Sequence, residues 1–298
     1  MPEWSPEVVV EEELARRLIR EQFPQVEARS LQLLGQGWDN TVWLVDGEWA
    51  FRFPRKQFAV CGLGNEIAYL PKLAPLLPLP IPVPTLIGQP SEKFQWPFYG
   101  AAFIPGRELA EARLDEEGRV ALARPLAEFL RTLHAVEFAA DLPVDPVRRT
   151  DMPFRVPLAR KRLTEVEELG LWQPPRSVDG LLSEAENLPS ARPTAVCHGD
   201  LHLRHLLIGE ENEPAGVIDW IDLSRNDPAV DLVLFWAALP PEGRTVFLDA
   251  YGPLSEEQLL RARALSFFLC GVLAVYARHE GLPELEREAV ESLARTCL

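Results

Sequence analysis

The sequence predicts an α+β chain of two lobes, in which an antiparallel sheet with one main helix precedes a mainly helical part that contains a short β-hairpin. Segments with two-residue alternation and hairpin turns precede residue 104, whereas segments with helical periodicity dominate after it. The length of 298 residues also suits two lobes, because domains commonly contain about 100–200 residues. We therefore predict a first lobe over residues 1–104 and a second lobe over residues 105–298.

The first lobe is predicted to open with a helix. Ser5 is suited to the N-cap and Pro6 to the first helical position, and the acidic run from Glu11 to Glu13 favours the positive end of a helix that continues to Gln22.

A sheet is predicted to follow this helix. Short alternating segments are interrupted by Gly35-Gln36-Gly37, by the hairpin turn Asp46-Gly47 and by a proline-rich connector. The predicted strands are Leu31–Leu34, Thr41–Val45, Glu48–Phe53, Thr85–Ile87 and Phe98–Ile104, and the predicted helix of this sheet is Leu63–Leu76.

The second lobe begins after Pro105-Gly106 and reads as mostly helix. One β-rich island, residues 195–219, interrupts the helical pattern with an apolar strand, a polar loop and two short strands. The predicted helices are Glu116–Ala135, Leu158–Leu169, Ala229–Leu239, Glu256–Arg278 and Pro283–Ala294.

The composition excludes several classes of protein. A formal charge of −15 without clustered Lys or Arg argues against nucleic-acid binding, although an acidic surface attracts cationic substrates. The four cysteines form no metal-binding or disulfide pattern. No apolar run of about 18 residues is present and the N-terminus is acidic, so we expect a cytoplasmic protein without a membrane partner. No coiled-coil seam is present, and a monomer is expected.

Two carboxylates in the β-rich island indicate chemistry. Asp200 lies in the loop of Cys197-His-Gly-Asp-Leu-His-Leu-Arg-His-Leu-Leu207, and Asp219 ends the strand Val217-Ile-Asp-Trp220. A loop and a strand end on one hairpin place both acids at the same edge, where one meets a hydroxyl and the other holds a metal between phosphates. Phosphoryl transfer requires those two roles. The alternative for each acid is an N-cap or turn carboxylate.

These motifs resemble the aminoglycoside phosphotransferase family. The resemblance rests on His-Gly-Asp-Leu, on a residue five positions after Asp200, and on Ile-Asp ahead of the Asp-Pro-x-x-Asp-Leu box of residues 227–232. It implies a protein-kinase-like fold and a kinase for a small-molecule hydroxyl. It also implies that Asp200 accepts the hydroxyl proton and that Asp219 binds Mg²⁺.

His205 departs from the common family pattern, which has Asn at this place. As a metal ligand, an imidazole weakens the preference for magnesium and admits manganese. The sequence resembles the 2″-aminoglycoside and macrolide 2′-phosphotransferases in having His here. The alternative is a histidine that only forms hydrogen bonds within the loop. We interpret His198 as a residue that braces the loop and leave His202 undecided.

The first lobe carries the motifs that the resemblance assigns to the nucleotide, which is ATP or GTP. Gly35 and Gly37 suit a loop over the phosphates, although two glycines are equally typical of a plain turn. The flanking Phe residues should point to the sheet face opposite to Arg52. The resemblance implies that Arg52 grips phosphates and pairs with Glu66, and that the hinge strand ending at Ala102 and Ile104 reads the purine. The alternative for Glu66 is a solvated helix residue. The alternative for the small residues of the hinge strand is packing under a crossing helix.

The remaining motif residues have two interpretations each. Asp227 and Asp231 are predicted to cap a helix and to hold the catalytic loop in place. Trp220 and Asp222 are candidates for an acceptor pocket, with core and surface positions as the alternatives.

Three functional hypotheses follow. The first is a kinase for an antibiotic-like acceptor, an aminoglycoside before a macrolide. The second is a housekeeping kinase of a sugar, amino alcohol or amino acid, because a fold does not fix the acceptor. The third is a nucleotide-binding pseudokinase, against which Asp200 and Asp219 count.

Overall fold

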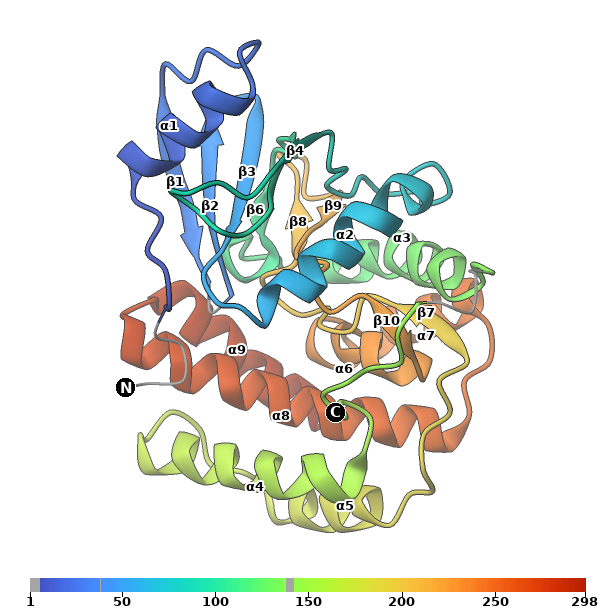
Figure 1. Cartoon of the computed structure of the whole chain (residues 1–298). Coiled ribbons are helices and arrows are strands. Elements are labelled where there is room, and N and C mark those ends of the chain that lie inside the picture. Colours follow the sequence, from blue (N-terminus) through green and yellow to red (C-terminus); the bar gives the residue numbers. More distant parts are fainter. Residues whose placement is uncertain (1–5, 38, 138–141) are drawn as a thin grey trace. The chain divides into compact units, whose positions relative to one another are not determined.

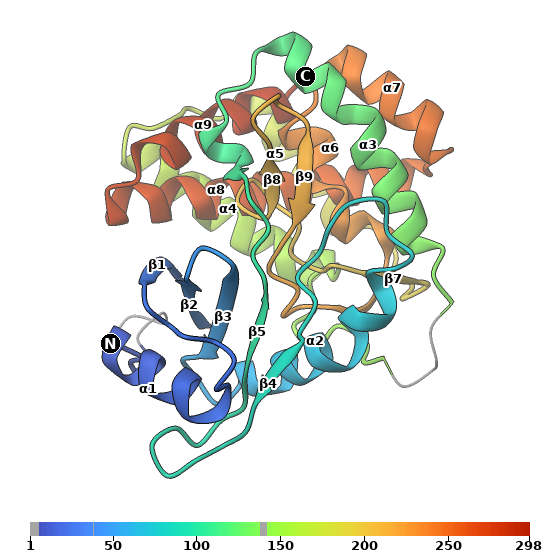
Figure 2. The same ribbon diagram turned by 90° about the horizontal axis from the view of Figure 1, so that it is seen from above.

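The computed structural model describes residues 6–37, 39–137 and 142–298. The chain divides into a first unit, residues 1–76 with 80–104, and a second unit, residues 77–79 with 105–298. Figures 1 and 2 show the ribbon from two directions. The observed elements match the predicted class, an antiparallel sheet with helices followed by a mostly helical part.

The first unit is built on one antiparallel sheet with the strand order β1-β2-β3-β5-β4 over its described residues. Val45 and Glu48 close the β2–β3 hairpin through a main-chain hydrogen bond, with positive φ at Asp46 and Gly47 as the sequence predicted. The strands are β1 (Leu31–Gln36), β2 (Asn40–Val45), β3 (Trp49–Pro54), β4 (Leu86–Gly88) and β5 (Phe98–Ala102).

Two helices cover the two faces of this sheet (Figure 2). Helix α1 (Glu12–Gln22) packs against a cluster that includes Phe51, Phe53 and Phe98, whose side chains are buried. Helix α2 (Ala59–Leu73) places Leu63 against Tyr99 and Ala101 on the other face. Because side chains alternate along a strand, Arg52 between the two Phe residues points to the face that carries α2.

The predicted start of the first helix is wrong. The helix begins at Glu12, and the N–H groups of Glu7 and Val8 donate to the carbonyl of Arg55, which ties this segment to the residue after β3. Glu12 and Glu13 therefore lie in the first turn of the helix, and not in a later turn of a helix that starts at Pro6. Ser5 lies outside the described residues. Helix α2 likewise begins and ends earlier than the predicted Leu63–Leu76.

The second unit consists mainly of helices. Its long helix α8 lies alongside α4 and α9 (Figure 1). The helices are α3 (Glu116–His134), α4 (Met152–Glu168), α5 (Arg176–Glu186), α6 (Val233–Ala237), α7 (Pro241–Tyr251), α8 (Glu256–Glu280) and α9 (Pro283–Thr296), with the 3₁₀ turns η1 (Leu109–Glu111) and η2 (Pro228–Asp231). Helix α8 is long and apolar enough to cross a membrane, but 61% of its apolar window is buried, as is usual for a core helix.

Two small antiparallel sheets frame the predicted β-rich island. Strand β7 pairs with β10, and the hairpin of β8 and β9 is extended by β6. The strands are β6 (Arg107–Glu108), β7 (Ala195–Cys197), β8 (Leu206–Ile208), β9 (Pro214–Val217) and β10 (Ser224–Asn226). This framework fixes both ends of the loop that carries Asp200.

Candidate active site

The loop between β7 and β8 brings the predicted residues of the second unit together. Asp200 lies in this loop, and Asp219 follows β9 in the left-handed region with φ of 67°. His205 reaches both acids, with its Nε2 3.5 Å from Oδ2 of Asp219 and its Nδ1 3.9 Å from Oδ2 of Asp200. The carboxylates are 27% and 37% exposed, so both reach solvent while the imidazole between them is buried.

The ring of His205 is oriented by the main chain. Its Nδ1–H donates to the carbonyl of Asp200 over 2.7 Å, which leaves the lone pair of Nε2 directed toward Asp219. Burial lowers the pKa of His205 to about 4, and the charge of Asp219 only partly opposes this shift. His205 therefore presents a nitrogen lone pair beside a carboxylate, which is a donor set for a divalent cation.

His202, which the sequence left undecided, stacks on His205 with ring centroids 3.7 Å apart. Its Nδ1 accepts the N–H of Arg204, so its Nε2 carries the proton and faces Oδ2 of Asp200 at 3.5 Å. Burial, together with neighbouring positive groups, holds the pKa of His202 well below its usual value. The ring thus directs an N–H group toward one carboxylate oxygen of Asp200.

His198 makes the bracing contacts that the sequence predicted. Its Nδ1 accepts the N–H of Asp200 over 3.2 Å, and its Nε2 lies 3.0 Å from the carbonyl of Ile218. The side chain is fully buried. One imidazole therefore joins the loop of Asp200 to the strand end that precedes Asp219.

Asp227 and Asp231 have architectural contacts, as predicted. Asp227 caps η2 by accepting the N–H of Ala229, and Asp231 accepts the N–H groups of His198 and Gly199, each over 2.8 Å. A Cβ at Gly199 would lie 2.5 Å from the carbonyl oxygen of Asp222, so only glycine fits there.

The interpretation of Trp220 as a residue of an acceptor pocket is wrong. Its side chain is fully buried, its Nε1–H donates to the carbonyl of Val217, and its ring packs against His198 and Phe129. Because the indole of Trp220 is fully buried, it packs against the loop that carries Asp200 and cannot contact a substrate.

Asp222 is held by a residue that sequence reasoning missed. Arg149 Nη2 lies 2.7 Å from Oδ2 of Asp222, and its Nη1 lies 3.2 Å from Oδ1 of Asp145. The charges of Asp222, Asp200 and Asp145 outweigh burial and raise the pKa of Arg149. No motif marks Arg149, because the ion pair joins segments that are 73 residues apart in sequence.

A second missed pair supports the loop. Arg204 binds Glu108 through two hydrogen bonds, from Nε over 2.9 Å and from Nη2 over 3.0 Å. Burial raises the pKa of Glu108, and Arg204 partly offsets this shift. The bidentate pair ties the loop to β6, since Glu108 ends that strand.

The predicted cation of the first unit lies beside its predicted partner. Arg52 Nε is 3.5 Å from Oε2 of Glu66, and both side chains are nearly or fully buried. With the amide of Asn40 oriented to accept, its oxygen lies 3.1 Å from Nε and 2.8 Å from Nη2 of Arg52. Glu66 is therefore not a solvated helix residue, because it neutralises a buried guanidinium.

The glycine segment lies at the end of β1, with Gly35 inside the strand and Gly37 directly after it. Gly35 lies at an irregularity of the β1–β2 ladder, and the N–H of Gly37 donates to the carbonyl of Asn40. Among described residues, no atom lies within 4 Å of a Cβ built at Gly35. Ala102 ends β5 and is exposed, and Ile104 follows it half-buried. Trp38, which follows Gly37 in the sequence, lies outside the described residues.

Comparison with known families decides the class of this protein. Residues 30–265 match the model of the phosphotransferase enzyme family, a span that includes every residue of the site described above. The chain belongs to this phosphotransferase family. The phosphotransferase is accordingly an enzyme that transfers phosphoryl groups to hydroxyl acceptors.

Solved structures share the fold of this phosphotransferase. It is 26% identical to the GDP and kanamycin complex of APH(2")-IIIa, with a TM-score of 0.67 over 95% of this chain and 98% of that one. It is 20% identical to the apoenzyme of macrolide 2'-phosphotransferase MphH from Brachybacterium faecium, with a TM-score of 0.60 and coverage of 94% and 97%. It is 17% identical to the streptomycin-ATP-APH(2")-IIa ternary complex, with a TM-score of 0.57 and coverage of 96% and 99%.

Proposed function

We propose that this phosphotransferase moves the γ-phosphoryl group of ATP or GTP, with Mg²⁺, onto a hydroxyl of an antibiotic-like acceptor. The assembly of Asp200, His205 and Asp219 on one loop and hairpin carries this proposal. An acid that reaches solvent beside a cation site is the minimum that phosphoryl transfer requires. The pseudokinase hypothesis is disfavoured, because the solvent-accessible carboxylate of Asp200 beside the cation site is needed for proton transfer and not for nucleotide binding.

The donor set of the second unit fits a divalent cation. Asp219 offers a half-exposed carboxylate, and His205 offers the Nε2 lone pair that its bond to the carbonyl of Asp200 keeps unprotonated. When bound there, Mg²⁺ would neutralise charge on the β- and γ-phosphates. A nitrogen ligand is softer than an amide oxygen, so we expect Mn²⁺ to support activity as well.

Asp200 would act on the acceptor. Its carboxylate accepts the proton of the acceptor hydroxyl as the hydroxyl oxygen bonds to the γ-phosphorus and the bond to the β–γ bridging oxygen breaks. His202 directs its Nε2–H toward Oδ2 of Asp200 and would hold the carboxylate in place for this proton transfer. The nucleoside diphosphate then leaves with the electron pair of the broken bond.

The first unit would bind the nucleotide. Arg52, which is oriented by Glu66 and Asn40, is the proposed ligand of the α- and β-phosphates. Gly35 and Gly37 are proposed to let main-chain N–H groups approach the phosphates, and the main chain of Ala102 and Ile104 to read the purine.

The first choice of acceptor is an aminoglycoside, which the structural likeness to a kanamycin complex supports. One observation favours a macrolide as the second candidate. Asp222, the carboxylate expected to receive a cationic acceptor, is already paired with Arg149. The guanidinium of Arg155 lies over the rings of Phe154 and Phe268, each centroid 5.4 Å away. A housekeeping kinase remains the alternative, and we expect a cytoplasmic monomer.

The test is a turnover screen of the purified chain. Aminoglycosides, macrolides and metabolite alcohols are each incubated with ATP or GTP and Mg²⁺, and nucleoside diphosphate is measured with Asp200→Asn as the control. Acceptor-dependent turnover that Asp200→Asn abolishes supports the proposal. Turnover with a metabolite alone would reject the antibiotic assignment, and no turnover with any acceptor would reject the kinase itself.

A further inference from the structure

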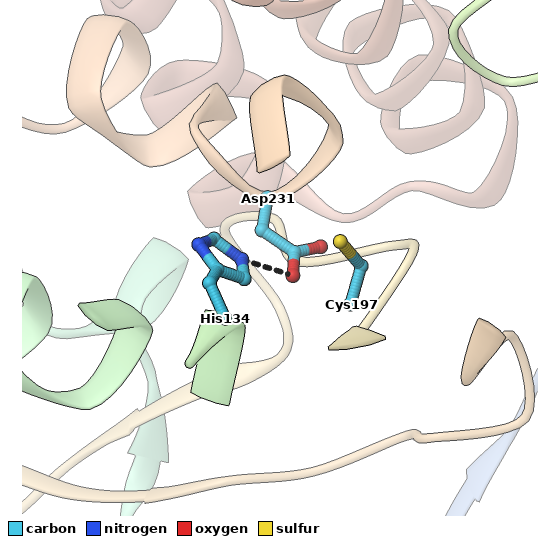
Figure 3. A group of neighbouring side chains, drawn as sticks. All are labelled: His134, Cys197 and Asp231. Atoms are coloured by element: carbon cyan, nitrogen blue, oxygen red, sulfur yellow. Dashed lines mark hydrogen bonds and ion pairs between the residues drawn. The ribbon is translucent and has the colours of Figure 1, made fainter. Parts of the chain in front are cut away.

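A second cluster of polar side chains lies buried beneath the catalytic loop. His134 ends α3, Cys197 ends β7 and Asp231 ends η2, and their nitrogen, sulfur and oxygen atoms lie within 4.8 Å of one another (Figure 3). Tyr251, the last residue of α7, adds its hydroxyl 2.7 Å from Nδ1 of His134. None of these residues belongs to the proposed chemistry.

Asp231 is the member that touches the loop. Its Oδ1 accepts the N–H of Gly199, and its Oδ2 accepts the N–H of His198 and faces Nε2 of His134 at 3.1 Å. The carboxylate is fully buried. It therefore holds the N–H groups of the two residues that directly precede Asp200, and the second of these, Gly199, has a left-handed φ of 90°.

The hydrogen bonds of this cluster have one direction. The carboxylate of Asp231 can only accept, so Nε2 of His134 carries a proton and donates to it. Nδ1 of His134 then presents its lone pair, and the hydroxyl of Tyr251 donates to it over 2.7 Å. The order is Tyr251 to His134 to Asp231 to the loop.

The same three atoms resemble a metal site, but their chemistry argues against one. Burial and the charges of Asp231 and Asp227 raise the pKa of Cys197 well above its usual value, so the sulfur remains a thiol. Its Sγ lies 3.8 Å from the carbonyls of Ala195 and Asp227, as a weak donor would. The oxygens of Asp231 already accept N–H groups.

We propose that His134 and Tyr251 are positioning residues, which set the main chain of the catalytic loop through Asp231. This inference rests on the proposed function in one respect, because Asp200 is the group that they position. Neither side chain meets a substrate. Their loss should lower kcat with little change in either KM, since the nucleotide and acceptor contacts remain.

The chain offers a matched pair of variants at one position. His134→Gln keeps an N–H donor at about the place of Nε2, whereas His134→Asn keeps a polar group only at about the place of Nδ1. We expect His134→Asn to lower kcat about 10-fold with both KM values within about 2-fold, and His134→Gln to stay within about 3-fold of the parent kcat. Tyr251→Phe should lower kcat about 3-fold, because without the tyrosine hydroxyl His134 is held less firmly in the tautomer that donates from Nε2 to Asp231.

Hydrogen exchange tests the positioning without turnover. We expect the amides of residues 195–203 to exchange faster in His134→Asn and Tyr251→Phe than in His134→Gln and the parent chain. Equal exchange in all four proteins, or equal kcat in His134→Asn and His134→Gln, overturns the inference. If His134→Asn does not fold, Tyr251→Phe decides by the same two measurements. An inactive parent chain rejects the proposed function alone, because the exchange comparison still decides the positioning.

Discussion

His205 donates its Nδ1–H to the main-chain carbonyl of Asp200 over 2.7 Å and thereby turns its Nε2 toward Asp219. One imidazole thus links the main chain of the proposed catalytic base to the proposed metal ligand. With a metal ion at Asp219, this link would make the metal affinity and the conformation of the loop interdependent.

The carboxylate of Asp200 is expected to be essential for turnover but not for nucleotide binding. Asp200→Asn removes the proton acceptor and keeps the size of the side chain, so kcat should fall about 10²–10⁴-fold while the KM for nucleotide changes little. Steady-state kinetics with the acceptor from the screen measures both. An unchanged kcat would exclude Asp200 as the base.

The metal preference should depend on residue 205. His205→Asn replaces a nitrogen ligand by an amide oxygen, which magnesium prefers, so the ratio of kcat/KM with Mg²⁺ to that with Mn²⁺ should rise several-fold. His205→Ala is the control, because it offers neither ligand and should weaken activity with both metals. The same ratio in the parent chain and His205→Asn would indicate that residue 205 does not touch the metal.

The loop histidines should make the fold sensitive to acid. Burial lowers the pKa values of His198, His202 and His205, so the unfolded chain binds more protons below pH 6.5. Stability is therefore complete above pH 6.5 and is lost as the pH falls toward 4, with about 2–3 kcal/mol from His205. Urea unfolding with a chelator measures this, and His205→Asn should show the smaller loss between pH 6.5 and 4.

The glycine before Asp200 should tolerate no side chain. Gly199→Ala places a Cβ 2.5 Å from the carbonyl oxygen of Asp222 at a positive φ, so unfolding free energy should drop by about 1–3 kcal/mol or more, and activity with it. Gly180 in α5 is the matched control, because no atom of the described chain lies within 4 Å of a Cβ there. Gly180→Ala should stabilise the protein by about 0.5–1 kcal/mol. Equal unfolding midpoints for the two variants would contradict the packing at Gly199.

The ion pair between Asp222 and Arg149 should determine how tightly cationic acceptors bind. Arg149→Met leaves Asp222 without its guanidinium, so the KM for a polycationic aminoglycoside should fall several-fold while that for a macrolide does not. The double variant Arg149→Met with Asp222→Asn is the control for lost packing and should not bind the aminoglycoside more tightly. Identical KM values in both variants would place Asp222 away from the acceptor.

Much of the fold and part of the site could be predicted from local pattern. The alternation Phe51-Arg52-Phe53 correctly placed two rings on one sheet face and the guanidinium on the other, because side chains alternate along any strand. The spacing of Asp200 and His205 likewise brought both to one loop, since five positions along the chain cannot separate them far.

Element boundaries and short elements were harder to predict. Helix α5, helix α7 and strand β10 were not predicted, and the predicted helix over residues 229–239 is only η2 followed by the short α6. Short segments carry too few residues for a clear period, so packing against neighbours decides their conformation.

The sequence by itself determined which residues are candidates for the chemistry, because residue type and local spacing set the donors on the hairpin. Only the tertiary structure decided what surrounds them. Trp220 became core, Asp222 met Arg149, and His134 met Asp231, which lies 97 residues away in sequence. Such contacts join segments that have no local relation, and they depend on how whole helices and strands pack, which no short pattern encodes.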